Sequence, residues 1–376
     1  RIIEDKSGVR LSLSTLKRLW RSDSIKNPHP STLDALASLV DAKDWLDFKK
    51  DYPPETSKKS PPSITWITVA VLAAALVLVG FFVIQPETDQ LPASSAKAPV
   101  VLGPISFTAN KTIATGVPNT VVFKYDVHNL QADEFYLQQS WNEKHRESLD
   151  PRVNNFSSTY YTPGFHRAKL VANDSIVKMA RIHIKTNGWL PLVKYHRDDL
   201  VPIYIRDQQT THDGSLSISP EQLQQAGIDM SKNFILNYHN VREFDSLESS
   251  NLQLQTKVKL DSIGNYACPQ ISITMVCEEG IFYVPLTSLG CVGNIGIKFG
   301  EVVKNSRNSD LSALGVNPFD WQELQVSIKD KKASIQLNQV EVFEAEYSMD
   351  YGLLMGLVIS FTGPGSVDHV KVLDSQ

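Results

Sequence analysis

One segment limits what this chain can be more than any other. Residues 64–84 read ITWITVAVLAAALVLVGFFVI, a run of 21 residues without a charged side chain. An α-helix rises about 1.5 Å per residue, so a helix of this length crosses the roughly 30 Å hydrocarbon core of a bilayer. A buried helix of a globular domain is usually shorter and keeps a polar stripe. The segment therefore predicts one transmembrane helix, with a short segment before it and a long one after it.

The flanking charges predict the orientation of this helix. Residues 49–63 carry four lysines against Asp51 and Glu55, whereas residues 85–99 carry Glu87 and Asp89 with only Lys97. An excess of lysine marks the cytoplasmic side. We therefore expect a cell-membrane protein with a cytoplasmic N-terminus and with residues 85–376 outside the cytoplasm. A cleaved signal peptide ending near residues 96–98 is the alternative, but 63 residues precede the apolar run, which argues against it.

Residues 1–50 predict a small all-α module. Leu13, Leu16 and Trp20 form an apolar stripe of one helix, and a second helix begins at Pro30. Hydroxyl and basic side chains lie on the first helix away from this stripe, and such groups contact DNA phosphates and bases. The alternative is a solvated basic face that binds another protein or nothing. The DNA-contact candidates are Ser14, Thr15, Lys17, Arg18 and Arg21.

The strings GVRLSLSTLKRLWRSD and PHPSTLDALASLVDAKDWLDFKK resemble the helix-turn-helix-like module at the N-termini of bacterial single-span envelope proteins. The resemblance implies that residues 13–21 are the recognition-like helix. It also implies that most of the first helix of the module is missing, so that the chain is N-terminally truncated. Pro-rich linkers at residues 51–63 and 85–99 separate the membrane helix from the parts on either side.

Residues 100–190 alternate apolar and polar side chains over short segments, which predicts an all-β sandwich. The strings VPNTVVFKYDV, QQSW and TYYTPGFHRAKLVAND resemble the PKD domain, an immunoglobulin-like sandwich common on cell surfaces. The resemblance implies a spacer or contact surface.

Residues 191–232 are expected to be a connector with one short helix, and residues 233–376 a second sandwich. Two hairpins are predicted there, at residues 271–286 and 324–337. The strings DWQELQVSIKDKKASIQLNQVEVFEAEY and GLLMGLVISFTGPGSVDHVKVLD resemble the concanavalin/laminin-G-like superfamily. That resemblance implies a jelly-roll sandwich and the binding of glycans or proteins.

All three cysteines lie in this last domain, and three cysteines allow one disulfide. Cys268 and Cys291 stand just outside the first hairpin, so their bond would join its two ends. Cys277 lies in the apolar phase of a strand and is expected to be a buried thiol. We predict the pair Cys268–Cys291.

No catalytic or metal-binding arrangement is predicted. His145, His166 and His183 lack the close spacing of zinc ligands. Glu344 and Glu346 share one face of a strand, which is typical of a solvated surface rather than of a glycosidase pair. We therefore expect no enzyme activity, no metal and no cofactor. The aromatic side chains that could stack on a sugar are expected mainly to pack in the core; they are Tyr266, Phe282, Tyr283, Tyr347 and Tyr351.

Two functions fit this organisation. The first is a membrane-tethered sensor or regulator, in which residues 100–376 bind a glycan or protein outside and residues 1–50 contact DNA or a cytoplasmic protein. The second is a cell-surface adhesion or glycan-binding protein with no DNA-binding role. An envelope enzyme is the least favoured hypothesis, and the net charge of −4 dictates no partner.

Overall fold

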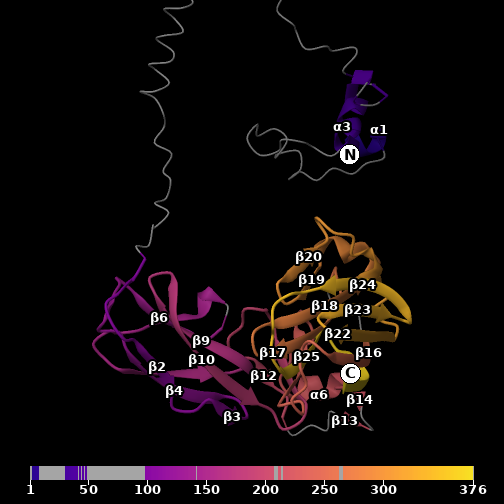
Figure 1. Cartoon of the computed structure of the whole chain (residues 1–376). Coiled ribbons are helices and arrows are strands. Elements are labelled where there is room, and N and C mark those ends of the chain that lie inside the picture. Colours follow the sequence, from indigo (N-terminus) through magenta and orange to yellow (C-terminus); the bar gives the residue numbers. More distant parts are fainter. Residues whose placement is uncertain are drawn as a thin grey trace, which may run out of the picture. The chain divides into compact units, whose positions relative to one another are not determined.

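The structure is a computed structural model that describes residues 2–7, 30–40, 42–43, 45, 47–48, 98–140, 142–206, 211–212, 215–261 and 266–375 (Figure 1). It divides into two compact units, residues 1–93 and 94–376. The predicted membrane segment, residues 64–84, lies outside the described residues. Within the described part of the chain, no helix has both the length and the apolar character to span a bilayer.

The first unit contains short helices. They are α1 (Ile2–Ser7), α3 (Pro30–Ala37) and the 3-10 turn η1 (Ser38–Val40). Helix α3 begins at the proline from which the sequence predicted it, because proline fits the first turn of a helix. Its Ala35 and Ala37 are buried. All five DNA-contact candidates lie outside the described residues, so the helix-turn-helix assignment stays a prediction.

The second unit begins with a β-sandwich. The apolar phase expected around residues 121–127 is confirmed, because Val121, Phe123 and Tyr125 are all buried between two sheets. The smaller sheet has the order β2 (Ser106–Ala109), β4 (Asn119–Asp126), β8 (Asn155–Tyr160). The larger has the order β3 (Ile113–Thr115), β10 (Ser175–Lys185), β9 (Gly164–Ala172), β6 (Phe135–Gln138), β7 (Arg146–Ser148), and β1 (Val100–Val101) pairs with β5 (Leu130–Gln131).

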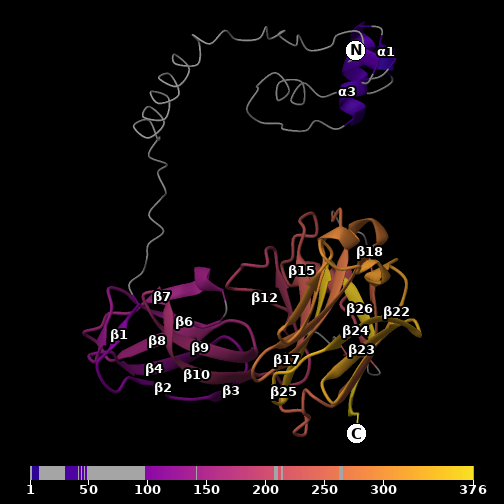
Figure 2. The same ribbon diagram turned by 45° about the horizontal axis from the view of Figure 1, so that its top comes forward.

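Two further sheets pack face to face into a jelly-roll-like sandwich, visible as two layers in Figure 2. The layer called here the front sheet has the order β12 (Ile203–Tyr204), β11 (Leu190–Lys194), β15 (Ile235–Val241), β25 (Leu354–Thr362), β17 (Gln270–Cys277), β18 (Ile281–Ser288), β19 (Gly296–Phe299), β20 (Val302–Asn305), with β21 (Gly315–Val316) beside β18. The layer called the back sheet has the order β13 (Thr211–His212), β14 (Ser215–Leu216), β26 (Gly365–Asp374), β16 (Leu252–Leu260), β22 (Gln322–Lys329), β23 (Lys332–Leu337), β24 (Val340–Glu346).

The packing of this sandwich follows from strict alternation of buried and partly exposed side chains along its strands. Along β16 every second residue is buried, from Leu252 to Leu260. Facing them across the core are front-sheet side chains such as Ile273 and Tyr238. Both expected hairpins are present, as β17–β18 and β22–β23.

The expected connector is part of this sandwich. Strand β11, at the start of residues 191–232, pairs along its whole length with β15, and β14 pairs with β26. Only α6 (Pro220–Gln225) matches the expectation, with Ser219 and Gln222 forming a capping box. The strands were missed because they are short and carry little alternation. Their pairing partners lie far away in the sequence.

The two sandwiches are joined by specific polar contacts. Arg167 and Arg181, on neighbouring strands of the first sandwich, both pair with Glu279 in the turn between β17 and β18. His183 donates through Nε2 to the Met355 carbonyl at 3.2 Å. Tyr204 donates to the Tyr161 carbonyl at 2.8 Å. These contacts involve several strands of the front sheet, and strand β9 of the first sandwich also packs against β17 and β25.

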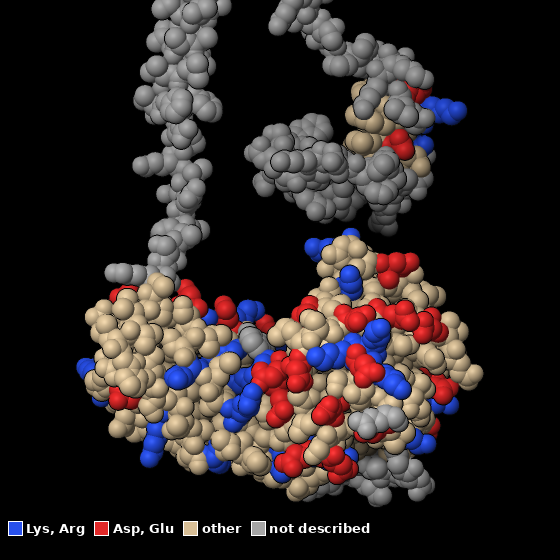
Figure 3. Space-filling view, viewed as in Figure 1, with Lys and Arg blue, Asp and Glu red and all other residues tan. Residues whose placement is uncertain are grey.

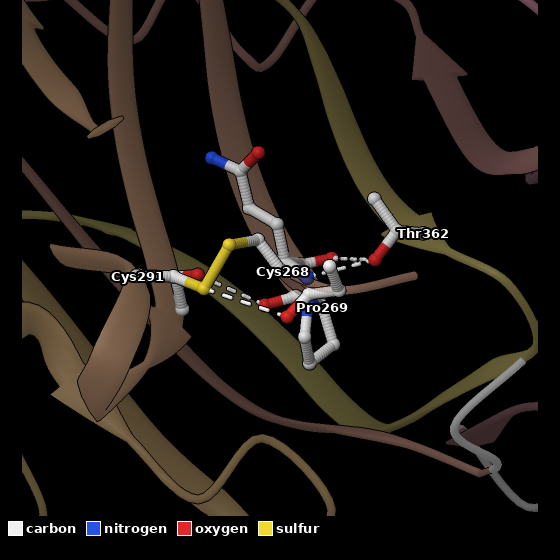
Figure 4. The surroundings of a disulfide bond; sticks show 7 residues. Cys268, Pro269, Cys291 and Thr362 are labelled. Atoms are coloured by element: carbon white, nitrogen blue, oxygen red, sulfur yellow. Dashed lines mark hydrogen bonds between the residues drawn. A yellow bond between two sulfur atoms is a disulfide. The ribbon is translucent and has the colours of Figure 1, made fainter. Parts of the chain in front are cut away.

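The disulfide Cys268–Cys291 forms as predicted, with a Cα–Cα distance of 5.6 Å (Figure 4). Cys277 is a buried free thiol. The bond joins the segment before β17 to the 3-10 turn η3 (Leu289–Asn294) after β18. Next to it, the backbone amide of Gln270 donates a hydrogen bond to Thr362 Oγ1 at 2.7 Å. The bond therefore fixes the end of β17 at which Gln270 emerges.

Candidate binding groove

The outer face of the front sheet carries polar side chains in registered rows. Because side chains alternate between the faces of a strand, the residues between the core positions of β15, β25 and β17 all point away from the core. One row is Asn237, Ser360 and Ser272; the next contains His239, Val358, Thr274 and Tyr283. A third begins at Ile235 and Thr362 and continues to Gln270.

These rows form the floor of an open groove with a volume of about 270 Å³. Lys194 from the end of β11 and Arg197 from the following loop line one side. Thr162, in the loop between β8 and β9 of the first sandwich, also lines it. The groove is therefore built by both sandwiches. Its lining residues are Thr162, Lys194, Arg197, Ile235, Asn237, His239, Gln270, Ser272, Thr274, Tyr283, Ser360, Phe361 and Thr362.

A chain of hydrogen bonds holds several of these side chains in place. Arg197 Nη2 donates to Gln270 Oε1 at 2.9 Å, and Gln270 Nε2 donates to Tyr283 Oη at 3.2 Å. In the neighbouring row, Ser360 Oγ donates to Asn237 Oδ1 at 2.7 Å. Preorganised side chains lose less conformational entropy when a ligand binds.

His239 is the exception to this satisfied network. Its side chain is 8% exposed, and Nδ1 is buried without a hydrogen-bond partner among the described residues. Burial, and to a smaller extent the neighbouring Lys194 and His166, lower the pKa of the imidazole to about 3. The ring is therefore neutral at ordinary pH. A buried polar group without a partner costs free energy.

Lys194 is the second unsatisfied group. It is half-buried, and burial lowers its pKa, while Asp199 and Asp198 oppose that shift. Neither carboxylate pairs with it: Asp198 binds Lys144 at 2.8 Å, and Asp199 accepts from the backbone amides of Tyr195 and His196. Within the described part of the chain, the ammonium group of Lys194 has no hydrogen-bond or ion-pair partner.

The charged side chains that line the groove all have the same sign. In the face that Figure 3 shows, basic and acidic side chains are interspersed over the second sandwich. Among the described residues that line the groove there is no aspartate or glutamate, while Lys194 and Arg197 are basic. The groove is therefore locally cationic on a chain whose net charge is −4.

Past Arg197 the surface is hollowed again. A second depression of about 650 Å³ shares Arg197 and Ile235 with the groove, and it is also lined by Tyr195, Lys232 and Tyr266. The groove and this depression therefore adjoin at these two shared residues.

Most residues considered from the sequence lie elsewhere. Phe282, Tyr347 and Tyr351 are buried in the core, as expected, whereas Tyr283 lines the groove. His183 is at the interface of the sandwiches, and the ring of His166 is tilted against that of Tyr160, with 4.6 Å between the ring centroids. Glu344 and Glu346 are exposed on β24. The described residues include no cluster of three or more His, Cys, Asp or Glu that could hold a metal.

The groove residues themselves were missed. Lys194 and Arg197 lie in the expected connector, and Asn237, Ser272 and Ser360 are ordinary outward positions of strands. A signal was present in the strand Gln270–Cys277, where Gln, Ser and Thr alternate with apolar residues. Alternation alone, however, gives no indication of which polar faces bind a ligand.

Comparison with known proteins gives limited guidance. No family model matches the sequence, and no curated protein matches it. Among solved structures, the carbohydrate-binding module CBM66 from Bacillus subtilis is 8% identical, with a TM-score of 0.26, and the match covers 37% of this chain and 81% of that one. Alginate lyase AlyC3 is 10% identical at a TM-score of 0.28, covering 50% and 90%. Sheep galectin-11 is 11% identical at 0.25, covering 36% and 96%. Likenesses this weak carry no argument about function.

Proposed function

We propose that residues 98–375 form a glycan-binding module and that the groove on the front sheet is its site. The observation that carries this proposal is the set of registered rows of amide and hydroxyl side chains, with His239 unsatisfied among them. Asn, Gln, Ser and Thr side chains both donate and accept hydrogen bonds, as sugar hydroxyls do.

Other ligand classes fit less well. An added peptide strand needs a free sheet edge, but the groove lies on a sheet face whose backbone groups are paired by neighbouring strands. A typical drug-like or cofactor pocket is lined mainly by apolar groups. The groove is lined mainly by polar side chains, and Ile235 and Phe361 supply its aliphatic and phenyl groups. A hydroxyl-rich, extended ligand matches this lining best.

The proposal is binding without turnover. Most glycosidases place two carboxyl groups around the scissile bond, and the described lining contains none. His239 and Tyr283 lie in one row but three strand spacings apart, which is roughly 14 Å at about 4.8 Å per spacing. They are too far apart to act on one bond as an acid and base pair.

The test is binding of the full chain to a glycan panel, measured by affinity electrophoresis and calorimetry. Ser360→Trp would place an indole in the middle of the groove and should abolish binding. Ser327→Trp is the matched control, because Ser327 is also a half-exposed serine in mid-strand, on the outer face of the back sheet. Equal binding by both variants, or no binding by the wild-type protein, would refute the proposal.

The finer assignments rest on the sequence: the two domain families on resemblance, and the membrane anchor and its orientation on the apolar run and its flanking charges. We propose that the first sandwich is PKD-like and the second laminin-G-like, that residues 64–84 anchor the chain in the cell membrane, and that residues 85–376 lie outside the cytoplasm. The sensor or regulator function stays a prediction of the sequence, because its DNA-contact candidates lie outside the described residues. Salt-dependent binding of duplex DNA by the full chain, lost in a Lys17/Arg18/Arg21→Ala variant, would support it.

A further inference from the structure

We propose that the groove selects anionic glycans and that Lys194 binds their acidic group. This inference rests on the proposed glycan-binding function and specifies the class of ligand. The shared chemistry is a carboxylate or sulfate on a sugar ring, which an ammonium group binds through charge-assisted hydrogen bonds.

The first argument is the state of Lys194. Removing an ammonium group from water is unfavourable unless an anion compensates for the lost hydration. Half-buried Lys185 has Glu243 at 3.6 Å, and half-buried Lys259 has Asp261 at 3.5 Å. Lys194 is as buried as these, yet within the described residues it has no such partner. The anion that would complete the site is therefore expected from the ligand.

The second argument is the absence of competing charge. A carboxylate in the groove would repel an anionic ligand, and the described lining contains none. The acidic groups near Lys194 already have partners. Asp198 forms an ion pair with Lys144, and Asp199 accepts hydrogen bonds from two backbone amides. Arg197 adds a second cation, and one of its Nη atoms is fixed on Gln270.

The third argument is the position of His239. Its pKa of about 3 keeps the ring neutral, so it adds no charge next to Lys194. A neutral imidazole can donate to or accept from a sugar hydroxyl. An acidic group at Lys194 and a hydroxyl at His239 would orient one sugar ring across the rows. The ligand would then continue past Arg197 into the second depression, where Lys232 and Tyr266 lie.

The experiment compares charged and neutral forms of the same glycans on the full chain. Uronate-bearing oligosaccharides are paired with their methyl esters, and sulfated ones with their desulfated forms. The two arms distinguish a carboxylate from a sulfate. We expect the wild-type protein to bind the charged member of a pair at least about tenfold more tightly at low salt, with the difference decreasing as salt is raised.

Lys194→Met keeps the length of the side chain and removes its charge, so it should abolish the preference. Lys257→Met is the matched control, because Lys257 is also a half-buried lysine that points outward from a strand, here β16 of the back sheet. Its Nζ lies 5.8 Å from the centroid of the Trp321 ring. That variant should keep the preference. Both variants should unfold at the same denaturant concentration as the wild-type protein or at a slightly higher one.

The outcomes separate this inference from the function on which it rests. If neutral glycans bind as tightly as charged ones and Ser360→Trp blocks both, the groove binds glycans but the anionic selection is wrong. A preference that persists in Lys194→Met would equally refute the role of Lys194. If the wild-type protein binds no member of the panel, the glycan-binding function itself is wrong and this inference fails with it.

Discussion

The two sheets of the second sandwich both expose polar outer faces, but they differ in how those polar groups are satisfied. On the back sheet the side chains bond to one another: Gln255 donates to Gln325 at 3.3 Å, Gln325 donates to Ser327 at 3.1 Å, and Ser334 donates to Glu341 at 2.8 Å. On the front sheet His239 Nδ1 and Lys194 have no partner among the described residues. Unsatisfied groups, rather than polarity itself, are thus what separates these two polar faces.

The largest expected effect concerns the covalent restraint on the front sheet. The double variant Cys268→Ser/Cys291→Ser opens a loop with a sequence separation of 23 residues. We expect the free energy of unfolding to fall by about 3 kcal/mol, because the unfolded chain regains the entropy of that loop. Urea unfolding measures this loss, and the wild-type protein in reducing buffer should show the same midpoint. A loss below about 1 kcal/mol would mean that the bond contributes little to the sheet.

A second prediction concerns the acid sensitivity of the groove. The pKa of His239 is about 3 in the folded protein against an ordinary 6.5. As pH falls below about 6.5, the unfolded chain takes up a proton that the folded protein does not bind until about 3, so stability decreases over this window. Relative to pH 7, His239→Leu should recover roughly 2 kcal/mol of stability at pH 5.

His166→Leu is the comparison variant for this measurement. The pKa of His166 is about 4, also lowered by burial. The His166→Leu variant should therefore recover stability mainly between pH 6.5 and 4. Chemical unfolding at several pH values separates the two. Identical pH profiles for His239→Leu and the wild-type protein would show that the His239 ring is not held neutral by burial.

A third prediction concerns the back sheet, where the substitution removes a side chain whose hydrogen bonds are satisfied. Gln325→Leu on the back sheet removes the acceptor of Gln255 and the donor to Ser327. We expect it to destabilise the protein by about 0.5–1 kcal/mol, as breaking a satisfied hydrogen bond does. If His239→Leu at pH 7 destabilised the protein as much as Gln325→Leu, the difference between the two faces would be refuted.

The smallest expected effect concerns Lys194. Lys194→Met removes a half-buried charge that has no partner within the described residues, so we expect a gain of a few tenths of a kcal/mol. Lys257→Met should leave stability nearly unchanged. Thermal unfolding in the absence of ligand measures both, and a marked loss in Lys194→Met would indicate that the ammonium group has a structural role instead.

The comparison also shows how far sequence reasoning reaches. The hairpins β17–β18 and β22–β23, the helix at Pro220 and the pair Cys268–Cys291 could all be predicted. Each of these features depends on residues that are close in the sequence. The groove could not be predicted, because Lys194, Asn237, Ser272 and Ser360 come from four strands whose order in the sheet does not follow the sequence.

The sequence by itself determined the local elements: the β-strand periodicity, the turns, the disulfide and a 21-residue apolar run. It did so because strand alternation and turn chemistry are set by neighbouring residues. Only the tertiary structure decided that β11 joins the front sheet and that the first sandwich supplies Thr162 to the groove. The tertiary structure alone also decided that His239 and Lys194 lie together without partners, because a group's hydrogen bonds and burial depend on residues distant in the chain.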